Sequence, residues 1–256
     1  MDERLPVSVA VITKNEEGNI GACLASAPFA RQLVVVDSDS ADATVKIAKE
    51  AGAEVFIHPW RGFGPQKQFA LDQCRESWIM ILDADERMPP ETQRVIRQIV
   101  RENDQAISGF SFPRKNLFQE RWIRHAGWWP DRVVRLFRRG SGSVTDVAVH
   151  EAVVVTGPVK DLSCPIEHLV ESRLSEIIKK IDHYSTDGAR EAFRQGRAAT
   201  IPSALLRAVV TFFHGYVLRL GFLDGAPGLT LAVTDGVNKF FKYAKLAELT
   251  RRRGQP

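Results

Sequence analysis

The sequence predicts an α/β fold built on a mostly parallel sheet, and three observations lead to this expectation. In the first half of the chain, short apolar runs alternate with helical stretches. Polar or charged residues follow each run directly. Strands that alternate with helices predict a parallel sheet with helices on both faces. The predicted strands are Val7–Ile12, Leu33–Val36, Val55–Ile57 and Trp78–Leu82.

Helices are expected between and after these strands. Asp42, Ala43 and Thr44 open one helix that stops at Gly52, where glycine is a common helix terminator. Pro89 and Pro90 begin another, because proline is tolerated in a first turn. The predicted helices are Asn15–Ala27, Val45–Ala51, Gln66–Arg75 and a last one that reaches about Glu102.

The pattern changes after Gly109, which predicts a division of the chain. Short strands, Gly109–Pro113, Val133–Phe137 and Ala152–Val155, are separated by aromatic and basic loops up to Val170. From Ser172 onward the sequence is helical in character. We therefore expect a sheet domain over residues 1–170 and a helical, basic extension over residues 171–256.

The distribution of charge along the chain predicts the kind of partner, and the N-terminal sequence and the cysteines predict the cellular compartment. Residues 1–169 hold 21 Lys and Arg against 23 Asp and Glu, whereas residues 170–256 hold 14 against 8. The excess in the last third predicts an anionic partner, either nucleic acid or a membrane surface. The acidic start and the short apolar run after it do not resemble a signal peptide. With three scattered cysteines, a cytoplasmic protein is expected.

Four polar segments follow the predicted strands. In open parallel sheets, ligands bind at the carboxyl ends of the strands, so these segments predict a shared crevice. Neither G-x-G-x-x-G nor G-x-x-x-x-G-K-[ST] follows the first strand, which disfavours dinucleotide-binding and P-loop enzymes. The segments are Thr13–Glu17, Asp37–Asp42, His58–Lys67 and Asp83–Glu86.

The fourth segment indicates a metal ion. Asp83 and Asp85 stand one residue apart at the end of an apolar strand. Two such carboxylates can converge on Mg²⁺ or Mn²⁺, which take oxygen ligands and share substrate phosphates. The alternative is an acidic turn that caps the next helix. The carboxylate cluster at a ligand-binding edge needs a counter-charge, which favours the metal.

The predicted strand ends lie in three segments, in this order: VSVAVITKNEEGNI, LVVVDSDSADAT and WIMILDADE. In order and spacing these segments resemble the signatures of family 2 glycosyltransferases, which have the GT-A fold. The resemblance implies that Thr13 and Glu16 line a uridine pocket and that Asp37 hydrogen-bonds the base. It implies that Asp83 lies near the ribose or the metal and that Asp85 binds the metal. The usual second signature, D-D-G-S-x-D, lacks its glycine here.

Further roles follow from the same resemblance. Lys67 would reach the diphosphate, although a solvated helix lysine is the alternative. Displacement at an anomeric carbon needs a base for the acceptor hydroxyl, and Glu151 occupies the family's position for it. His150 competes for this role, because an unperturbed histidine titrates near neutral pH. The family often supplies a late histidine to the metal, and His168 is the candidate here.

A basic aromatic segment, Arg121–Arg139, is a candidate acceptor site. Its three tryptophans suit sugar rings and its six arginines suit phosphate. A nucleic-acid patch or a packing loop is the alternative. The string GWWPD…RLFRR resembles bacterial β-1,4-glucosyltransferases of the lipopolysaccharide inner core, whose acceptor is a phosphorylated, acidic glycolipid. The resemblance implies that Trp129, Asp131, Arg132 and Arg135 contact the acceptor or shape its pocket.

The C-terminal third fits a membrane surface. Apolar residues from Leu206 to Leu220 fall on one helical face, and the longest uncharged stretch, Ala208–Leu218, has 11 residues. A spanning helix needs about 20 residues, so we expect a packing or interfacial helix. The positive charge favours the interface, and GFLDG and KFFKYAKLAE also resemble the lipopolysaccharide subgroup. We expect a peripheral protein at the inner face of the cytoplasmic membrane, with no nucleic-acid partner.

Taken together, the residues and the resemblance predict an inverting, metal-dependent hexosyltransferase. The donor would be UDP-glucose and the acceptor a heptose of the lipopolysaccharide core. One alternative is a sugar-phosphate nucleotidyltransferase, but TKNEEGN stands where that class carries a glycine-rich basic loop. Another is a non-catalytic glycolipid-binding protein of the membrane surface, which has no need of Asp83, Asp85 and Glu151 together.

Overall fold

The computed structural model describes residues 3–145, 152–171 and 173–253. The chain forms two compact units. The sheet unit contains Met1–Lys115 and Asp131–Leu169. The helical unit contains Val170–Pro256 and, in addition, Asn116–Pro130. The first part of the basic aromatic segment therefore belongs to the helical unit.

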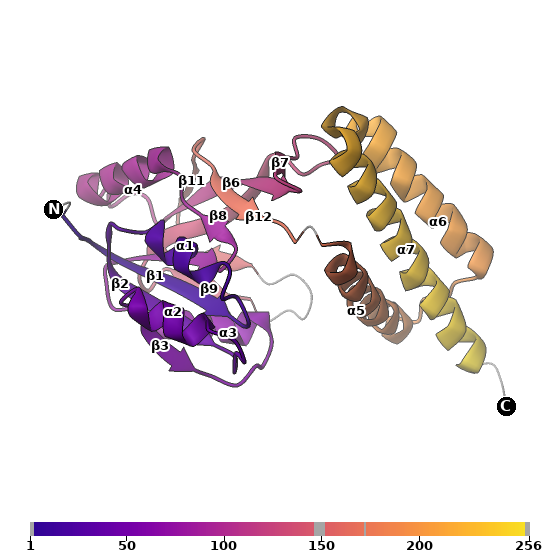
Figure 1. Cartoon of the computed structure of the whole chain (residues 1–256), viewed down its shortest axis with the longest axis horizontal. Coiled ribbons are helices and arrows are strands. Elements are labelled where there is room, and N and C mark those ends of the chain that lie inside the picture. The colour runs from indigo at the N-terminus through magenta and orange to yellow at the C-terminus, as the bar shows by residue number, and fades with distance from the viewer. Residues whose placement is uncertain (1–2, 146–151, 172, 254–256) are drawn as a thin grey trace. The chain divides into compact units, whose positions relative to one another are not determined.

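The sheet unit confirms the predicted α/β fold (Figure 1). Four parallel strands lie in the order β3-β2-β1-β4. They are β1 (Leu5–Thr13), β2 (Ala30–Asp37), β3 (Glu54–Ile57) and β4 (Trp78–Asp83). Every residue of β1 except Pro6 is buried, because helices cover both faces of the sheet. The carboxyl ends of all four strands therefore meet at one edge.

Beyond β4 the sheet continues with antiparallel pairs. β8 (Asp131–Arg138) pairs with β4, and β6 (Gly109–Phe118) pairs with β8. β12 (Ile166–Leu169) and β5 (Glu86–Arg87) complete the order. The shorter strands are β7 (Arg121–Trp122), β9 (Gly142–Val144), β10 (Val153–Val155) and β11 (Val159–Asp161).

Alternation along β1 divides the core of the sheet unit. Val7, Val9 and Val11 pack on one face with apolar residues of α1, α2 and α4, and Ala10 and Ile12 pack on the other with α3. The four helices are α1 (Ile20–Ala25), α2 (Thr44–Glu50), α3 (Phe63–Asp72) and α4 (Pro90–Glu102).

The first helix is shorter than the predicted Asn15–Ala27. The backbone N–H groups of Asn15 and Glu16 donate to the side chains of Ser40 and Thr44, at 2.8 Å each. Asn15 also has a positive φ of 54°. These contacts fix the segment after β1 as a loop, so α1 begins only at Ile20.

The helical unit consists of α5 (Leu174–Arg194), α6 (Ile201–Phe213) and α7 (Gly225–Arg253). Two short turns, η1 (His214–Leu218) and η2 (Gly221–Asp224), join α6 to α7. α6 begins with a capping box in which Thr200 and Ser203 exchange hydrogen bonds. Small and apolar residues, among them Ala189, Ala192 and Leu246, form the contact between α5 and α7.

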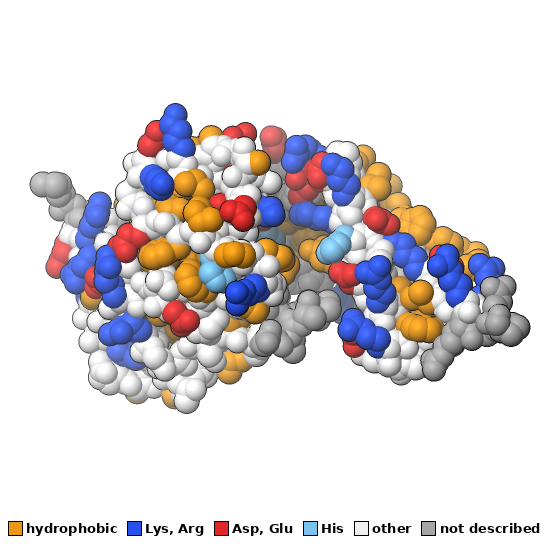
Figure 2. Space-filling model, turned by 90° about the horizontal axis from the view of Figure 1, so that it is seen from below, with side chains coloured by type: hydrophobic (Ala, Val, Ile, Leu, Met, Phe, Trp, Pro, Cys, Tyr) orange, Lys and Arg blue, Asp and Glu red, His pale blue; other side chains and the backbone are white. Residues whose placement is uncertain are grey.

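Many large apolar side chains of this unit are exposed, and Figure 2 shows them in orange along the helices. In α6 and η1 the exposed residues are Ile201, Leu205, Leu206, Val209, Val210, Phe213, Val217 and Leu218. By length and composition alone, Ile201–Leu218 could cross a membrane: its mean hydropathy is 1.4 and 6% of it is buried. This 18-residue segment is longer than the uncharged stretch Ala208–Leu218, because it also includes Arg207 and the apolar residues before Arg207.

Candidate active site

The ends of β1 and β2 are tied together. Thr13 and Asp37 are partners in the parallel register. Ser38 donates its backbone N–H to the carbonyl of Thr13 at 3.0 Å. Ser40 donates its backbone N–H to the Asp37 carboxylate at 2.9 Å, and its hydroxyl bonds the other carboxylate oxygen. The two strand ends therefore form one rigid surface at the ligand-binding edge of the sheet.

The side chain of Thr13 carries a polar group at this edge. The residue is buried, and its hydroxyl has no hydrogen-bond partner among the residues that the structure describes. A buried hydroxyl without a partner costs free energy, so such groups in native proteins call for an explanation. A ligand that bonds this hydroxyl would supply one, and the strand end is where such a ligand is expected.

The end of β3 is held by Gln66 of α3. Its amide nitrogen donates to the Ser38 hydroxyl at 2.9 Å and to the carbonyl of His58 at 3.1 Å. Its amide oxygen lies 2.9 Å from Nδ1 of His58, and the His58 ring stacks on Phe69. Gln66 is fully buried, so it fixes the second and third strand ends against the same helix.

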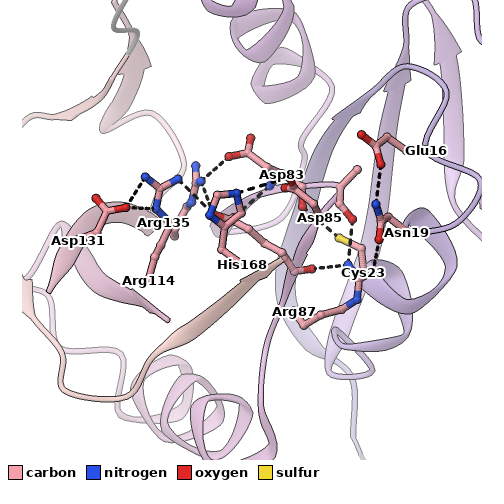
Figure 3. A network of polar contacts seen from close by, with 12 residues as sticks. Glu16, Asn19, Cys23, Asp83, Asp85, Arg87, Arg114, Asp131, Arg135 and His168 are labelled. Atoms are coloured by element: carbon pink, nitrogen blue, oxygen red, sulfur yellow. Dashed lines mark hydrogen bonds and ion pairs between the residues drawn. The ribbon is translucent and has the colours of Figure 1, made fainter. Parts of the chain in front are cut away.

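The end of β4 is surrounded by cations (Figure 3). The Asp83 carboxylate lies 3.0 Å from Nζ of Lys67 and 2.6 Å from Nη2 of Arg135. Burial alone would raise the pKa of the Asp83 carboxyl, but Arg135 and Lys67 outweigh it and hold that pKa well below its usual range. Asp83 is therefore ionised, and the buried Lys67 is its partner and not a solvated surface lysine.

Arg135 joins two carboxylates of the acidic turn Asp83–Glu86, which links β4 to β5. The same guanidinium nitrogen lies 2.6 Å from Glu86, which also accepts the backbone N–H of Asp83 at 3.1 Å. Burial works to lower the pKa of Arg135, but Asp83 and Glu86 raise it, so the guanidinium stays charged. Burial also raises the pKa of Glu86, against the opposing charge of Arg135. Arg114 adds a second cation, 3.8 Å from Glu86.

Asp85 faces a histidine from the far end of the sheet. β12 pairs antiparallel with β5, and this pairing brings Nε2 of His168 within 3.4 Å of the Asp85 carboxylate (Figure 3). Leu169 donates its backbone N–H to the carbonyl of Asp85 at 2.9 Å, which fixes the turn. Both side chains are partly exposed, so a ligand can reach them.

Asp85 and His168 fit a divalent cation that also binds phosphate. Among the described residues there is no group of three or more His, Cys, Asp or Glu side chains that would hold a metal alone. Mg²⁺ is usually bound through one or two carboxylates together with substrate phosphates, and Mn²⁺ also takes imidazole and oxygen ligands. A two-residue site is therefore suited to a metal that arrives with a diphosphate.

Residues 8–162 match the family model described as glycosyl transferase family 2. The chain belongs to this family. It is 28% identical over 268 residues to the lipopolysaccharide core biosynthesis glycosyltransferase LpsC of Rhizobium meliloti, covering 100% of this chain and 97% of its relative. It is 27% identical to an uncharacterized glycosyltransferase of Rickettsia typhi, covering 95% of this chain and 87% of the relative.

Two solved structures are similar in part. S. aureus TarS 1–349 in complex with UDP has a TM-score of 0.49 at 14% identity, covering 97% of this chain and 92% of that one. Glucosyl-3-phosphoglycerate synthase from Mycobacterium tuberculosis, in complex with Mn²⁺, UDP and glucosyl-3-phosphoglycerate, has a TM-score of 0.35 at 21% identity. It covers 45% of this chain and 44% of that one.

The remaining predicted site residues of this glycosyltransferase lie in several places. Glu151, like its competitor His150, is outside the described residues. Trp129 belongs to the helical unit and packs edge-to-face on Trp122. Asp131 pairs with Arg114 at 2.6 Å, and the exposed Arg132 lies 3.7 Å from the Asp161 carboxylate.

Sequence reasoning missed the groups that hold the site of this glycosyltransferase in place. Gln66, Glu86 and Arg114 were not assigned, and Arg135 was expected at the acceptor. One signal was available: Arg135 stands between Val134 and Leu136 in an apolar strand. A charge in such a strand needs a buried partner, and the acidic turn was the obvious source of one.

We expect Arg135→Leu to destabilise the glycosyltransferase by about 3–5 kcal/mol, because two carboxylates would lose their buried partner. Arg132→Leu on the same strand is the matched control. Its side chain is 38% exposed, so a change of about 1 kcal/mol or less is expected. Urea unfolding measures both.

A second substitution tests whether the lost stability comes from the unpaired carboxylates. Glu86→Leu added to Arg135→Leu removes one of the stranded carboxylates and should recover part of the loss. If Arg135→Leu and Arg132→Leu unfold at the same urea concentration, Arg135 does not stabilise the turn.

Proposed function

We propose that this glycosyltransferase is an inverting, metal-dependent hexosyltransferase that moves glucose from UDP-glucose onto a heptose of a lipopolysaccharide core acceptor. The observation that carries the proposal is the acidic turn at the end of β4. There Asp83 is held between two cations while Asp85 faces His168. The turn lies at the carboxyl edge of a parallel sheet, which is where such sheets bind nucleotides.

Thr13, Glu16 and Asp37 bind the uridine in this proposal. Two observations support it: among the described residues the buried hydroxyl of Thr13 has no partner, and Ser40 fixes the Asp37 carboxylate before any ligand arrives. Asp83 accepts a hydrogen bond from the ribose. Lys67 neutralises Asp83 and adds positive charge where the diphosphate lies. Preorganised groups of this kind lose little freedom on binding.

Asp85 and His168 would hold Mg²⁺ or Mn²⁺ beside the diphosphate. When bound, such an ion would neutralise the charge that develops on the departing UDP. Asp83 was also expected among the metal ligands, but its pairing with Lys67 and Arg135 favours a role beside the ion. The hydrogen bond from Leu169 to the carbonyl of Asp85 fixes the backbone of the turn between β4 and β5 that carries this carboxylate.

Glu151 accepts the proton of the acceptor hydroxyl as that oxygen attacks the anomeric carbon. The attack comes from the face opposite UDP, so an α-linked donor gives a β-linked product. The bond to the diphosphate breaks, and UDP leaves with the electron pair. A positioned base of this type contributes about 10²–10⁴-fold to a rate.

The acceptor assignment rests on the relatives and on the basic aromatic segment. The Rhizobium meliloti relative is described as a lipopolysaccharide core glycosyltransferase. Trp129, Asp131 and Arg132 are the acceptor residues in this proposal. We assign Arg135 to positioning Asp83, because its guanidinium is buried between carboxylates.

The helical unit binds the inner face of the cytoplasmic membrane in this proposal. Its support is the apolar side chains exposed on α6 and η1, together with the excess of positive charge in the last third of the chain. An exposed apolar helix face beside basic residues is typical of interfacial binding to anionic lipid.

Donor and acceptor are tested by measuring UDP release with Mn²⁺ or Mg²⁺. UDP-glucose, UDP-galactose and UDP-N-acetylglucosamine are compared, each with and without a heptose-bearing core lipid. We expect release that needs both metal and lipid and is fastest with UDP-glucose, and an axial–axial proton coupling in the product showing a β-linkage. If the rate of UDP release is the same with and without the core lipid, the acceptor assignment is refuted. An α-linked product would refute the inverting mechanism.

A further inference from the structure

A pocket of about 360 Å³ lies within the helical unit. One wall comes from β7 and the residues that follow it, and the other comes from η2. Part of it comes from the basic aromatic segment, but none of its residues is among the proposed acceptor residues Trp129, Asp131 and Arg132. The lining residues are Arg121, Trp122, Arg124, His125, Leu223 and Asp224.

Asp224 connects the two walls of this pocket. Its side chain is 3% exposed, and its carboxylate accepts the backbone N–H of Arg124 at 3.3 Å and of His125 at 2.9 Å. The ring Nδ1 of His125 lies 3.0 Å from the same carboxylate. Arg121 donates to the carbonyl of Leu223 at 3.2 Å. Four contacts between segments about a hundred residues apart therefore hold the two walls together.

The pocket carries more positive than negative charge. The guanidinium of Arg124 lies 4.0 Å from the centre of the Trp122 ring. Within the part of the chain that the structure describes, neither Arg121 nor Arg124 forms an ion pair with an Asp or Glu. Asp224 is the one acid in the lining, and two backbone amides and His125 already use it. Two exposed guanidinium groups on a fixed wall suit a phosphate, which arginine binds in bidentate fashion.

Apolar side chains are exposed on the turn that forms the second wall. Leu220, Phe222 and Leu223 are each close to half exposed, and Leu218 before them is 74% exposed. A soluble phosphate ester would give these side chains nothing to contact. At a membrane surface, phosphate headgroups and acyl chains adjoin, so a basic pocket beside exposed leucine and phenylalanine can contact both.

We infer that this pocket binds the phosphate of an anionic phospholipid headgroup, with Arg121 and Arg124 as the ligands and Asp224 as the positioning residue. The exposed side chains of η2 enter the acyl region beside the bound headgroup. The inference rests on the proposed membrane association of the helical unit and gives it a specific lipid contact.

Short-chain lipids below their micelle concentration test the pocket without a bilayer. We expect saturable binding of dihexanoyl phosphatidic acid to the full chain by calorimetry. The Arg121→Gln/Arg124→Gln variant should lose about tenfold or more in affinity, because both guanidinium contacts are removed. The matched control, Arg194→Gln/Arg197→Gln, removes two exposed arginines of the same unit and should change the affinity less than about twofold.

The outcomes separate this inference from the proposed function. Equal lipid binding by the wild type and by Arg121→Gln/Arg124→Gln overturns the headgroup site. That outcome leaves the proposed sugar transfer standing, because UDP release by the wild type tests it separately. Unchanged lipid binding with a raised KM for a phosphorylated core acceptor also overturns it and assigns the pocket to the acceptor. Equal losses in both double variants would show bulk charge attraction and would contradict a specific pocket. Thermal unfolding checks that each variant is folded.

Discussion

Asp85→Asn is expected to lower kcat/KM for UDP-glucose on the order of 10²–10³-fold, because a neutral amide replaces one of the two protein ligands of the proposed metal and binds the cation more weakly than a carboxylate. The side chain is partly exposed and lies 3.4 Å from Nε2 of His168, so the fold should tolerate the change. A steady-state assay of UDP release over a range of Mn²⁺ concentrations measures the effect. Part of the loss should be recovered at high Mn²⁺.

Two controls accompany this variant. Asp104→Asn removes an exposed carboxylate after α4 that caps a turn, and it should leave kcat/KM unchanged. His168→Gln removes the second ligand and should resemble Asp85→Asn in its dependence on Mn²⁺. Full activity of Asp85→Asn at low Mn²⁺ would mean that this carboxylate does not bind the metal.

Glu151→Gln is expected to lower kcat by about 10²–10⁴-fold, because the acceptor hydroxyl loses the base that takes its proton. Binding of UDP-glucose does not use this residue in the proposal, so the Kd for UDP should stay the same. The comparison with Asp85→Asn is informative, since the metal variant should weaken UDP binding as well. Single-turnover transfer and UDP titration separate the two effects.

His150→Asn is the matched control for the base. If Glu151 is the base, His150→Asn should lose far less of kcat than Glu151→Gln. A large loss in His150→Asn with a mild effect of Glu151→Gln would reverse the assignment. If both variants have the same kcat as the wild type, the base lies elsewhere in the chain.

The strand ends of the site could be predicted from local patterns. Apolar runs such as Trp78–Leu82 followed directly by Asp83 are visible in the sequence, and parallel strands must align their carboxyl ends. The predicted helix over Asn15–Ala27 was too long at its start, because its first residues bond side chains from the next loop. A single-segment pattern contains no information about such a contact.

The cations around the acidic turn depended on long-range pairing. Arg135 reaches Asp83 only because β8 lies antiparallel beside β4, and no local pattern states which strands are neighbours. His168 reaches Asp85 for the same reason, through the pairing of β12 with β5. The resemblance to a family pointed to His168, but it gave no indication that Asp83 would be held between Lys67 and Arg135.

The grouping of Asn116–Pro130 with the helices was equally hidden from local patterns. Asp224 lies about a hundred residues beyond His125, and the two meet only in the folded helical unit. The strings GWWPD and GFLDG each resembled the same subgroup, but nothing in either string indicates that the segments around them form one pocket.

Asp85 and His168 are proposed to hold a divalent metal together with the diphosphate of the donor, and the proposed mechanism depends on this. Electron paramagnetic resonance of Mn²⁺ tests it directly, because the signal of the free aqueous ion is lost on binding. We predict that the wild type removes this signal when UDP is present and that Asp85→Ala/His168→Ala does not. Equal loss of the signal with the double variant and UDP would contradict the assignment of the metal to these two residues.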